Sequence, residues 1–236
     1  MLTLYTFGPH FNMPDASPFC IKGLMLMKMS KLPHDVQKMN SRQAPKGKAP
    51  YLKDGDKLIA DSHFIKGHLE SQHNVDFTGG YGPDKLAIGW AFSRMMEEHM
   101  YFLSGYERWM VDENFWKGPI QFFKDAPAPL RPLIARIVRR KVGKGHQSQG
   151  LGRHNDDERF ALAKDNLIAI ETQLGRNPYI LGKTVSGADA SVFPFLWTAS
   201  SPYFKSRIAD YVRTRPSLVA YLARLKAEFF ADYAHG

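Results

Sequence analysis

The chain has 236 residues, of which 44% are hydrophobic and 23% charged, values typical of a folded globular protein and not of a disordered one. Its formal net charge is +9, and its single cysteine, Cys20, excludes an intrachain disulfide and points to a reducing compartment. There is no signal-peptide pattern and no apolar run of about 18 residues, so we expect a cytoplasmic protein without a membrane span.

The N-terminal third of the chain alternates between strand and helix signals. Residues 2–7 alternate apolar and hydroxyl-bearing side chains, which predicts a strand, and a loop rich in Gly, Pro, Asn and Asp follows over 8–16. Ser17 and Pro18 are typical of a helix N-cap and first turn, so a buried helix is expected to begin there. A second strand is predicted over 34–39.

Two further strands, 49–53 and 57–60, flank an Asp-Gly-Asp sequence that indicates a hairpin. Asp61 and Ser62 then begin a helix that is predicted to continue through His73. The resulting order is strand, helix, strand, loop, hairpin, helix. Such an order favours one sheet with parallel and antiparallel pairing together.

Residues 74–83 contain three Gly and one Pro without helical periodicity, and we expect them to be a linker. Beyond them strand signals nearly vanish, and 144–154 is a polar, glycine-bearing stretch that predicts a loop. The predicted fold is therefore an α/β domain at 1–75 followed by an all-α domain at 84–236. The helical candidates are amphipathic or apolar segments: 84–112, 129–142, 155–174, 187–199 and 216–230.

One predicted helix start is sharper than the others. Ser186 and Asp189 have the spacing of a capping box, and an apolar run follows them. We interpret this motif as structural: it begins a buried helix and takes no part in chemistry.

Three short segments carry candidate chemistry, and the first is the helix start at Ser17. Free N–H groups and a partial positive charge at a helix N-terminus lower the pKa of a thiolate placed there, and an N-cap hydroxyl can donate a hydrogen bond to it. The sequence offers both Ser17 and Cys20 as the residue beside a reactive thiol. We favour Ser17, because an N-cap side chain faces a ligand at the helix start, whereas Cys20 lies one turn into the helix and is expected to be partly buried. If Cys20 is instead exposed, a mixed disulfide becomes possible. Taken alone, Ser17 is more often a simple cap.

The second segment is Lys48, Ala49 and Pro50, directly before a strand. A proline there can take a cis peptide bond, and the residue before it can offer its N–H and C=O to an extended peptide. The third is Asp61 and Ser62, where a hydroxyl and amide groups at a helix start suit a carboxylate, and the acid suits an ammonium group. Each segment alone is a common structural feature.

Together, the three segments and their spacing resemble the N-terminal domain of glutathione transferases, whose thioredoxin-like fold is followed by an all-helical domain as in the second half here. The resemblance implies that glutathione is a co-substrate, that Ala49 binds its cysteinyl backbone and that Pro50 is cis. It implies that Asp61 and Ser62 bind the γ-glutamyl group and that Lys48 binds the glycyl carboxylate. It also implies a homodimer.

The resemblance extends to the metaxin and failed-axon-connections (Fax) branch of that family. It rests on the stretches LYTFGPHFNMPDASPFCIK, GKAPYLKDGDKLIADSHFI, EEHMYF, SQGLGRH and SGADASVFPFL. Two functions therefore stay open. One is a transferase with Ser17 as its catalytic residue, joining the glutathione thiolate to a small hydrophobic electrophile. The other is a non-catalytic glutathione-binding or protein-interaction module. The predicted walls of the electrophile site, which at helical spacing are more often core residues, are Phe11, Met13, Tyr106 and Trp109.

The basic cluster and the histidines are the two remaining features of the sequence. A dense basic cluster at 136–144 has no nucleic-acid motif beside it, so we interpret it as a solvated helix face, with nucleic acid or an acidic membrane as the alternative ligand. Nine histidines are present, but His63 and His68 are five apart and no Cys/His cluster occurs. The sequence therefore predicts neither a nucleic-acid partner nor a metal site.

Overall fold

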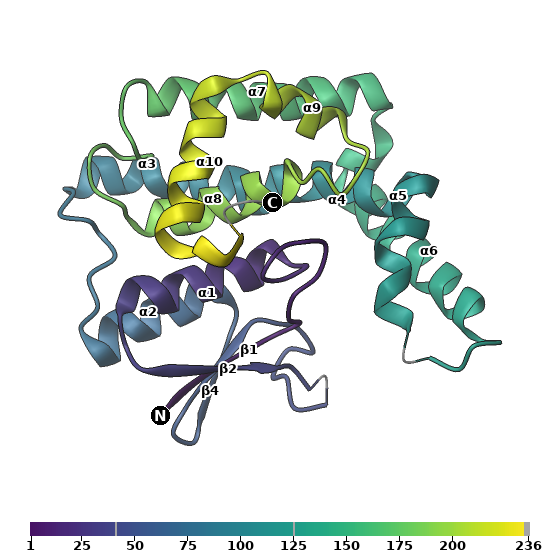
Figure 1. The fold of residues 1–236 in the computed structure, drawn as a ribbon, viewed down its shortest axis with the longest axis horizontal. Coiled ribbons are helices and arrows are strands. Elements are labelled where there is room, and N and C mark those ends of the chain that lie inside the picture. Colours follow the sequence, from purple (N-terminus) through teal and green to yellow (C-terminus); the bar gives the residue numbers. More distant parts are fainter. Residues whose placement is uncertain (41, 125, 234–236) are drawn as a thin grey trace.

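The computed structural model describes residues 1–40, 42–124 and 126–233. Its N-terminal third is a small sheet with two helices packed on it, and the helical remainder lies against those helices (Figure 1). This arrangement confirms the predicted α/β domain followed by an all-α domain. The N-terminal elements are β1 (Leu2–Thr6), α1 (Pro18–Ser30), β2 (His34–Lys38), β3 (Tyr51–Asp54), β4 (Lys57–Ala60) and α2 (Ser62–His73).

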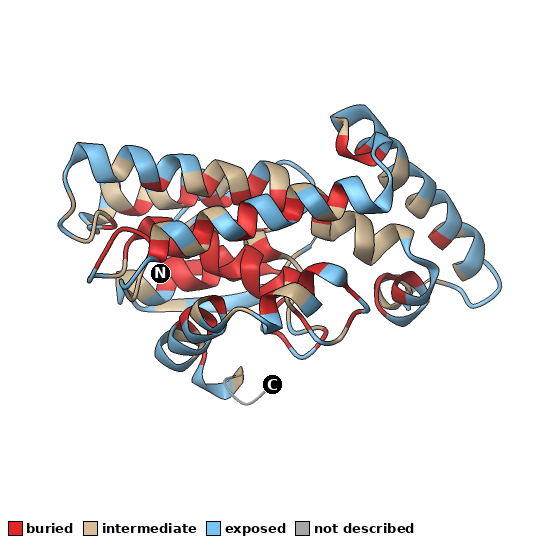
Figure 2. Cartoon of the chain, turned by 90° about the horizontal axis from the view of Figure 1, so that it is seen from above, coloured by how far each residue is buried: buried red, intermediate tan, exposed pale blue. Residues whose placement is uncertain are grey.

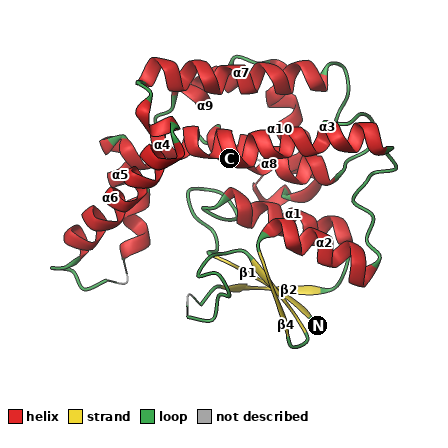
Figure 3. Ribbon diagram, turned by 180° about the vertical axis from the view of Figure 1, so that it is seen from behind, coloured by secondary structure: helices red, strands yellow, loops and turns green. Residues whose placement is uncertain are grey.

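The four strands follow the order β2-β1-β3-β4, with β1 and β2 parallel and the other neighbours antiparallel (Figure 3). Leu4 of β1 pairs with Leu52 of β3, and both are fully buried. The predicted hairpin is present, and its turn needs Gly55, which has a φ of 57°. Two parallel strands need a crossover connection, and α1 provides it between β1 and β2.

The helical half begins with a long continuous run of α3, a π-helical segment η1 and α4. This run matches the predicted segment 84–112. A π-helical turn inside a helix is uncommon and frequently marks a functional position. The elements are α3 (Pro83–Arg94), η1 (Met95–Met100), α4 (Tyr101–Met110), α5 (Asp112–Lys117), η2 (Pro119–Phe123), α6 (Arg131–Gln149), η3 (Leu151–Arg153), α7 (Asp156–Leu174), α8 (Gly187–Ala199), α9 (Arg207–Arg213), α10 (Pro216–Phe229) and η4 (Ala231–Tyr233).

The predicted loop at 144–154 is wrong in its first half, because α6 continues to Gln149. Local propensity argues against a helix containing two glycines, but packing overrides it. Gly143 lies against Met110 of α4, where a Cβ would come within 3.3 Å of the sulfur, and His146 is buried between the helices. The helix ends at Gly150, whose φ of 112° is a backbone conformation that favours glycine. The short helices α5 and α9 were not predicted.

Every residue of α8 is buried, and this helix is the centre of the core that both halves share (Figure 2). The predicted capping box at its start is present. Asp189 accepts hydrogen bonds from the backbone N–H of Ser186 and of Ile180, each at 2.9 Å, and from the Tyr221 hydroxyl at 3.0 Å. The predicted structural role of this motif therefore fits its geometry.

The two halves are also joined by a buried ion pair between α1 and η1. The Lys22 ammonium donates to Glu97 at 2.7 Å, and both side chains are almost completely buried. Arg94 adds a second contact to the same carboxylate, at 2.5 Å. Burial lowers the pKa of Lys22, and the attraction of Glu97 opposes that effect.

The basic cluster divides into two kinds of residue. Arg139 is partly buried and donates to the backbone oxygens of Trp109 and Met110, so it ties α6 to the end of α4. The exposed members of the cluster are Arg136, Arg140, Lys141 and Lys144. Within the described ranges of the chain, none of the helices combines the length and apolar character that crossing a bilayer requires.

Candidate functional site

Two of the three segments singled out in the sequence meet at one end of the sheet, and the body of α1 packs on them. The Asp61 N–H donates to the Pro50 carbonyl at 3.3 Å, so the start of α2 touches the start of β3. Gly23 of α1 packs on the Pro50 ring, and a Cβ at residue 23 would lie 3.3 Å from two of its carbons. The start of β3, the start of α2 and the body of α1 are therefore fixed relative to one another by direct contacts.

The peptide bond between Ala49 and Pro50 is cis, as the resemblance implied. Ala49 is partly exposed, and Pro50 is buried beneath it. Lys48 is exposed and follows Gly47, which has a φ of 62° in the turn before the strand. This edge therefore presents the partly exposed residue Ala49 with an exposed cationic side chain beside it.

The start of α2 has two features that a simple helix cap does not need. Asp61 has a φ of 80°, an unfavourable conformation for a residue with a side chain, and its carboxylate accepts from the His63 N–H at 2.9 Å. Ser62 is fully buried, yet its hydroxyl has no hydrogen-bond partner among the residues that the structure describes. Backbone strain and an unpaired buried polar atom gather at binding sites, because a ligand completes them.

At the start of α1, Ser17 occupies the N-cap position, but its side chain makes no capping hydrogen bond. The Ser17 hydroxyl instead contacts the Cys20 thiol. Burial raises the pKa of Cys20 well above its usual range, an effect that the hydrogen bond from Ser17 only partly offsets. Cys20 is completely buried, so the exposure that a mixed disulfide would require is not met.

Asp15, which the sequence analysis did not select, holds the start of α1 in place. Its carboxylate accepts from the backbone N–H groups of Gly8 and Ser17, each at 2.8 Å, and the residue is fully buried. Burial raises the pKa of Asp15 to about 6, despite the opposing effect of these hydrogen bonds. The spacing of Asp15 and Ser17 is that of an Asx turn, a signal that was available in the sequence.

Arg108 is the second residue that the sequence analysis missed. Its guanidinium donates to the carbonyl of Ala16, directly before Ser17, at 2.9 Å, and to the carbonyl of Thr198 at 3.3 Å. Burial lowers the pKa of Arg108 to about 10, so the side chain stays charged at neutral pH. No local sequence signal marks this role, because Arg108 and Ala16 are far apart in the chain.

The four predicted walls of an electrophile site fall into two groups. Phe11 and Met13 are buried, with 5% and 2% of their surface exposed, and the Phe11 ring lies edge-to-face with Phe122 at 5.6 Å. Trp109 lies 6.1 Å from the same Phe122 ring, so Phe11 and Trp109 share one aromatic cluster. Tyr106 instead lines a cavity of about 240 Å³ between α4, α7 and α9.

Sequence comparisons place these features in a family. The model of the glutathione S-transferase N-terminal domain matches residues 18–114, and that of the glutathione S-transferase C-terminal domain matches residues 163–225. An isoprene-epoxide–glutathione S-transferase of Rhodococcus sp. is 25% identical, over 97% of this chain and 99% of its own length. Failed axon connections of Drosophila melanogaster is also 25% identical, over 99% of this chain but 59% of its own length. A metaxin-1 homolog of the same fly is 23% identical over 96% of this chain and 72% of its own length.

Solved structures show the same architecture. The β-etherase LigF from Sphingobium sp. aligns with a TM-score of 0.70 at 18% identity, over 98% of this chain and 99% of that one. Human glutathione transferase theta-2, in a complex with glutathione, aligns with a TM-score of 0.64 at 16% identity, over 100% of this chain and 85% of that one. At these identities the similarity establishes the fold alone, and any chemistry has to be argued from the residues of the site.

Proposed function

The chain belongs to the glutathione S-transferase superfamily, and we propose that it binds glutathione where the starts of α1, β3 and α2 meet. In this proposal the Ala49 backbone pairs with the cysteinyl part of the tripeptide. Asp61 pairs with the γ-glutamyl ammonium, and the Ser62 hydroxyl donates to the γ-glutamyl carboxylate. Lys48 attracts the glycyl carboxylate.

The observation that carries the proposal is the buried Ser62 hydroxyl, which has no hydrogen-bond partner in the described part of the chain. Leaving a buried donor unpaired costs about 1–3 kcal/mol, which a carboxylate of the ligand would recover. Strain at Asp61 and the hydrogen bond from Asp61 to Pro50 add support, because they fix this hydroxyl beside the start of β3.

The proposed reaction joins the glutathione sulfur to an electrophilic carbon. The sulfur lies at the start of α1, where the helix N-terminus favours the thiolate and the Arg108 guanidinium adds positive charge nearby. On binding, the Ser17 hydroxyl would exchange its hydrogen bond to Cys20 for one to this thiolate. The thiolate forms an S–C bond while the bond from that carbon to the leaving group breaks. For an epoxide, the class named for the Rhodococcus relative, the leaving oxygen stays in the product and takes up a proton from solvent.

The test measures binding and thiol ionisation separately. Calorimetry should show that Ser17→Ala binds glutathione within about threefold of the wild type. Ultraviolet absorbance of the bound thiolate should show a thiol pKa lowered by about two units in the wild type, worth about 2–3 kcal/mol, and a shift largely lost in the variant. Ser30→Ala, at the other end of α1, is the matched control. Equal thiol pKa values in all three proteins would contradict the role of Ser17.

A second candidate function is a glutathione-binding or protein-interaction module without turnover. One observation favours it: Phe11 and Met13, two of the predicted walls of the electrophile site, are packed into the core. Glutathione binding without conversion of either an aryl halide or an epoxide would select this function over the transferase. The absence of glutathione binding would remove the transferase and the glutathione-binding module, and would leave only a protein-interaction module.

The proposal includes a homodimer in the cytoplasm. Exposed apolar side chains on β4, α2 and α3 are the surface proposed for it: Leu58, Phe64 and Trp90 are 47%, 57% and 52% exposed. His63 lies between the last two, with ring distances of 5.3 Å and 5.5 Å. Sedimentation of the wild type as a dimer, and of Phe64→Glu as a monomer, is the expected result; a monomeric wild type would refute the dimer.

A further inference from the structure

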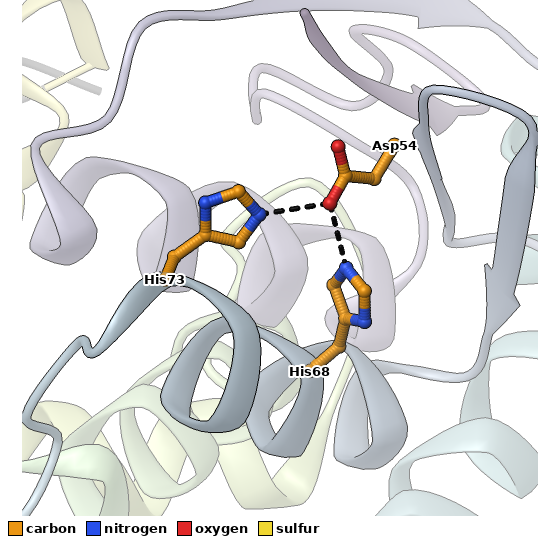
Figure 4. Close-up of side chains that lie close together, drawn as sticks. All are labelled: Asp54, His68 and His73. Atoms are coloured by element: carbon orange, nitrogen blue, oxygen red, sulfur yellow. Dashed lines mark hydrogen bonds and ion pairs between the residues drawn. The ribbon is translucent and has the colours of Figure 1, made fainter.

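A cluster of two histidines and one aspartate lies at the end of the sheet away from the candidate glutathione site. His68 and His73 come from the second half of α2, and Asp54 is the last residue of β3. Figure 4 shows both imidazole rings directed at the same carboxylate oxygen. The Nε2 atoms of His68 and His73 are each 2.8 Å from Asp54 Oδ2.

We propose that Asp54, His68 and His73 bind one divalent transition-metal ion of the zinc class. Three potential ligand atoms from the three side chains lie within 4.8 Å of one another. Two imidazole nitrogens and one carboxylate oxygen are a donor set that zinc accepts, with solvent water in the remaining position. Magnesium and calcium prefer oxygen donors alone, so the set also excludes them.

The present distances require only a small adjustment. Ligand bonds of about 2.0–2.2 Å in a tetrahedral zinc site place neighbouring ligand atoms about 3.3 Å apart. Each imidazole therefore withdraws from Asp54 by about half an ångström, within the freedom of a side chain. The exposed fractions of the three side chains are 11% for His68, 26% for His73 and 25% for Asp54, so an ion can reach the cluster from solvent.

The directions of the three side chains also suit a cation. Figure 4 shows that both Nε2 atoms face the Asp54 carboxylate, between α2 and the end of β3. A metal ion takes the lone pair of Nε2, so each metal-bound imidazole would carry its proton on Nδ1.

A bound metal ion would join the end of β3 to the end of α2. Asp54 closes β3, which starts after Pro50, and His73 closes α2, which starts after Asp61. An ion held by both ends clamps the hairpin onto α2, while the hydrogen bond between Asp61 and Pro50 joins their beginnings. The inference does not depend on glutathione binding, and its test uses none.

The experiment is a calorimetric titration of the untagged full chain with zinc chloride, with magnesium chloride as the ionic control. The wild type should bind one zinc ion with a Kd of micromolar order, and its thermal midpoint should rise. Asp54→Asn and His73→Gln, which keep side-chain size, should each weaken zinc binding at least tenfold and abolish the thermal shift. The matched controls are Asp56→Asn in the same hairpin turn and His63→Gln on the same helix, and both should bind as the wild type does.

The visible absorption of bound cobalt distinguishes a tetrahedral site from weak binding of the ion to the protein surface. A tetrahedral site gives the cobalt-loaded protein strong visible absorption, which should disappear in His73→Gln and persist in His63→Gln. Absence of stoichiometric zinc binding would overturn the proposal, as would equal binding by Asp54→Asn and the wild type. In either case the cluster would be a pair of hydrogen bonds that hold the hairpin to α2.

Discussion

Two helix starts in this chain place a serine near an aspartate, and the fold uses them in opposite ways. At α8, Asp189 is fully buried and accepts four hydrogen bonds, two from Ser186 and one each from Ile180 and Tyr221. At α2, Asp61 is exposed, while the buried Ser62 hydroxyl has no partner among the described residues. A satisfied polar network stabilises a core, whereas a buried hydroxyl without a partner leaves a hydrogen bond to be made, which in our proposal the ligand supplies.

The largest expected effect comes from removing the fully hydrogen-bonded carboxylate of Asp189. Asp189→Ala leaves two backbone N–H groups and two hydroxyls unpaired in the core, so we expect a loss of about 3–5 kcal/mol in the free energy of unfolding, measured with urea. Asp189→Asn keeps one acceptor oxygen and should lose less. A loss below about 1 kcal/mol in the alanine variant would mean that the network at α8 is not structural.

Asp15 extends the comparison to the start of α1, because it is satisfied and buried like Asp189 but holds a candidate catalytic residue. Its pKa of about 6 in the folded protein exceeds the ordinary value of 3.8, so the folded state binds the proton more tightly than the unfolded state does. The contribution of this group to stability is therefore present at low pH and is lost as pH rises from about 4 to about 6. The loss amounts to at most about 3 kcal/mol.

The variant Asp15→Asn cannot ionise and isolates this effect. The difference in unfolding free energy between the wild type and Asp15→Asn should shift in favour of the variant as the pH rises across that interval. Urea unfolding at a series of pH values measures it. A difference that stays constant between pH 4 and pH 7 would show that Asp15 titrates normally in the fold.

The smallest expected change in stability is at the start of α2. Ser62→Ala removes a hydroxyl that has no partner among the residues described, so the free energy of unfolding should stay the same or rise by about 1 kcal/mol. Glutathione affinity, measured by calorimetry, should fall about tenfold, which corresponds to one lost hydrogen bond to a charged group.

Ser93→Ala is the matched control for that experiment. Ser93 is also buried, but its hydroxyl donates to the Gly89 carbonyl at 2.7 Å, so this variant should lose stability and keep its glutathione affinity. If Ser62→Ala and Ser93→Ala both lose stability and keep affinity, the start of α2 is an ordinary helix cap.

Local patterns predicted most of the fold. Alternation along β1, the proline and glycine punctuation and the capping box at Ser186 depend on neighbours in the chain, and each appears where it was expected. The prediction was wrong where contacts between distant segments decide the outcome. Helix α6 runs through Gly143 and Gly145 because it packs against α4, which the local sequence cannot reveal.

The sequence by itself determined the order of elements, the three segments of the candidate site and the family resemblance, because these depend on residue type and spacing. Only the tertiary structure decided that the Ser62 hydroxyl is buried and lacks a partner within the described ranges. It also decided that Arg108 reaches Ala16 and that Asp54 meets His68 and His73. Whether a side chain is buried, and which distant side chains it contacts, depends on how the helices and the sheet pack. Residues far apart in sequence come into contact only in the folded chain.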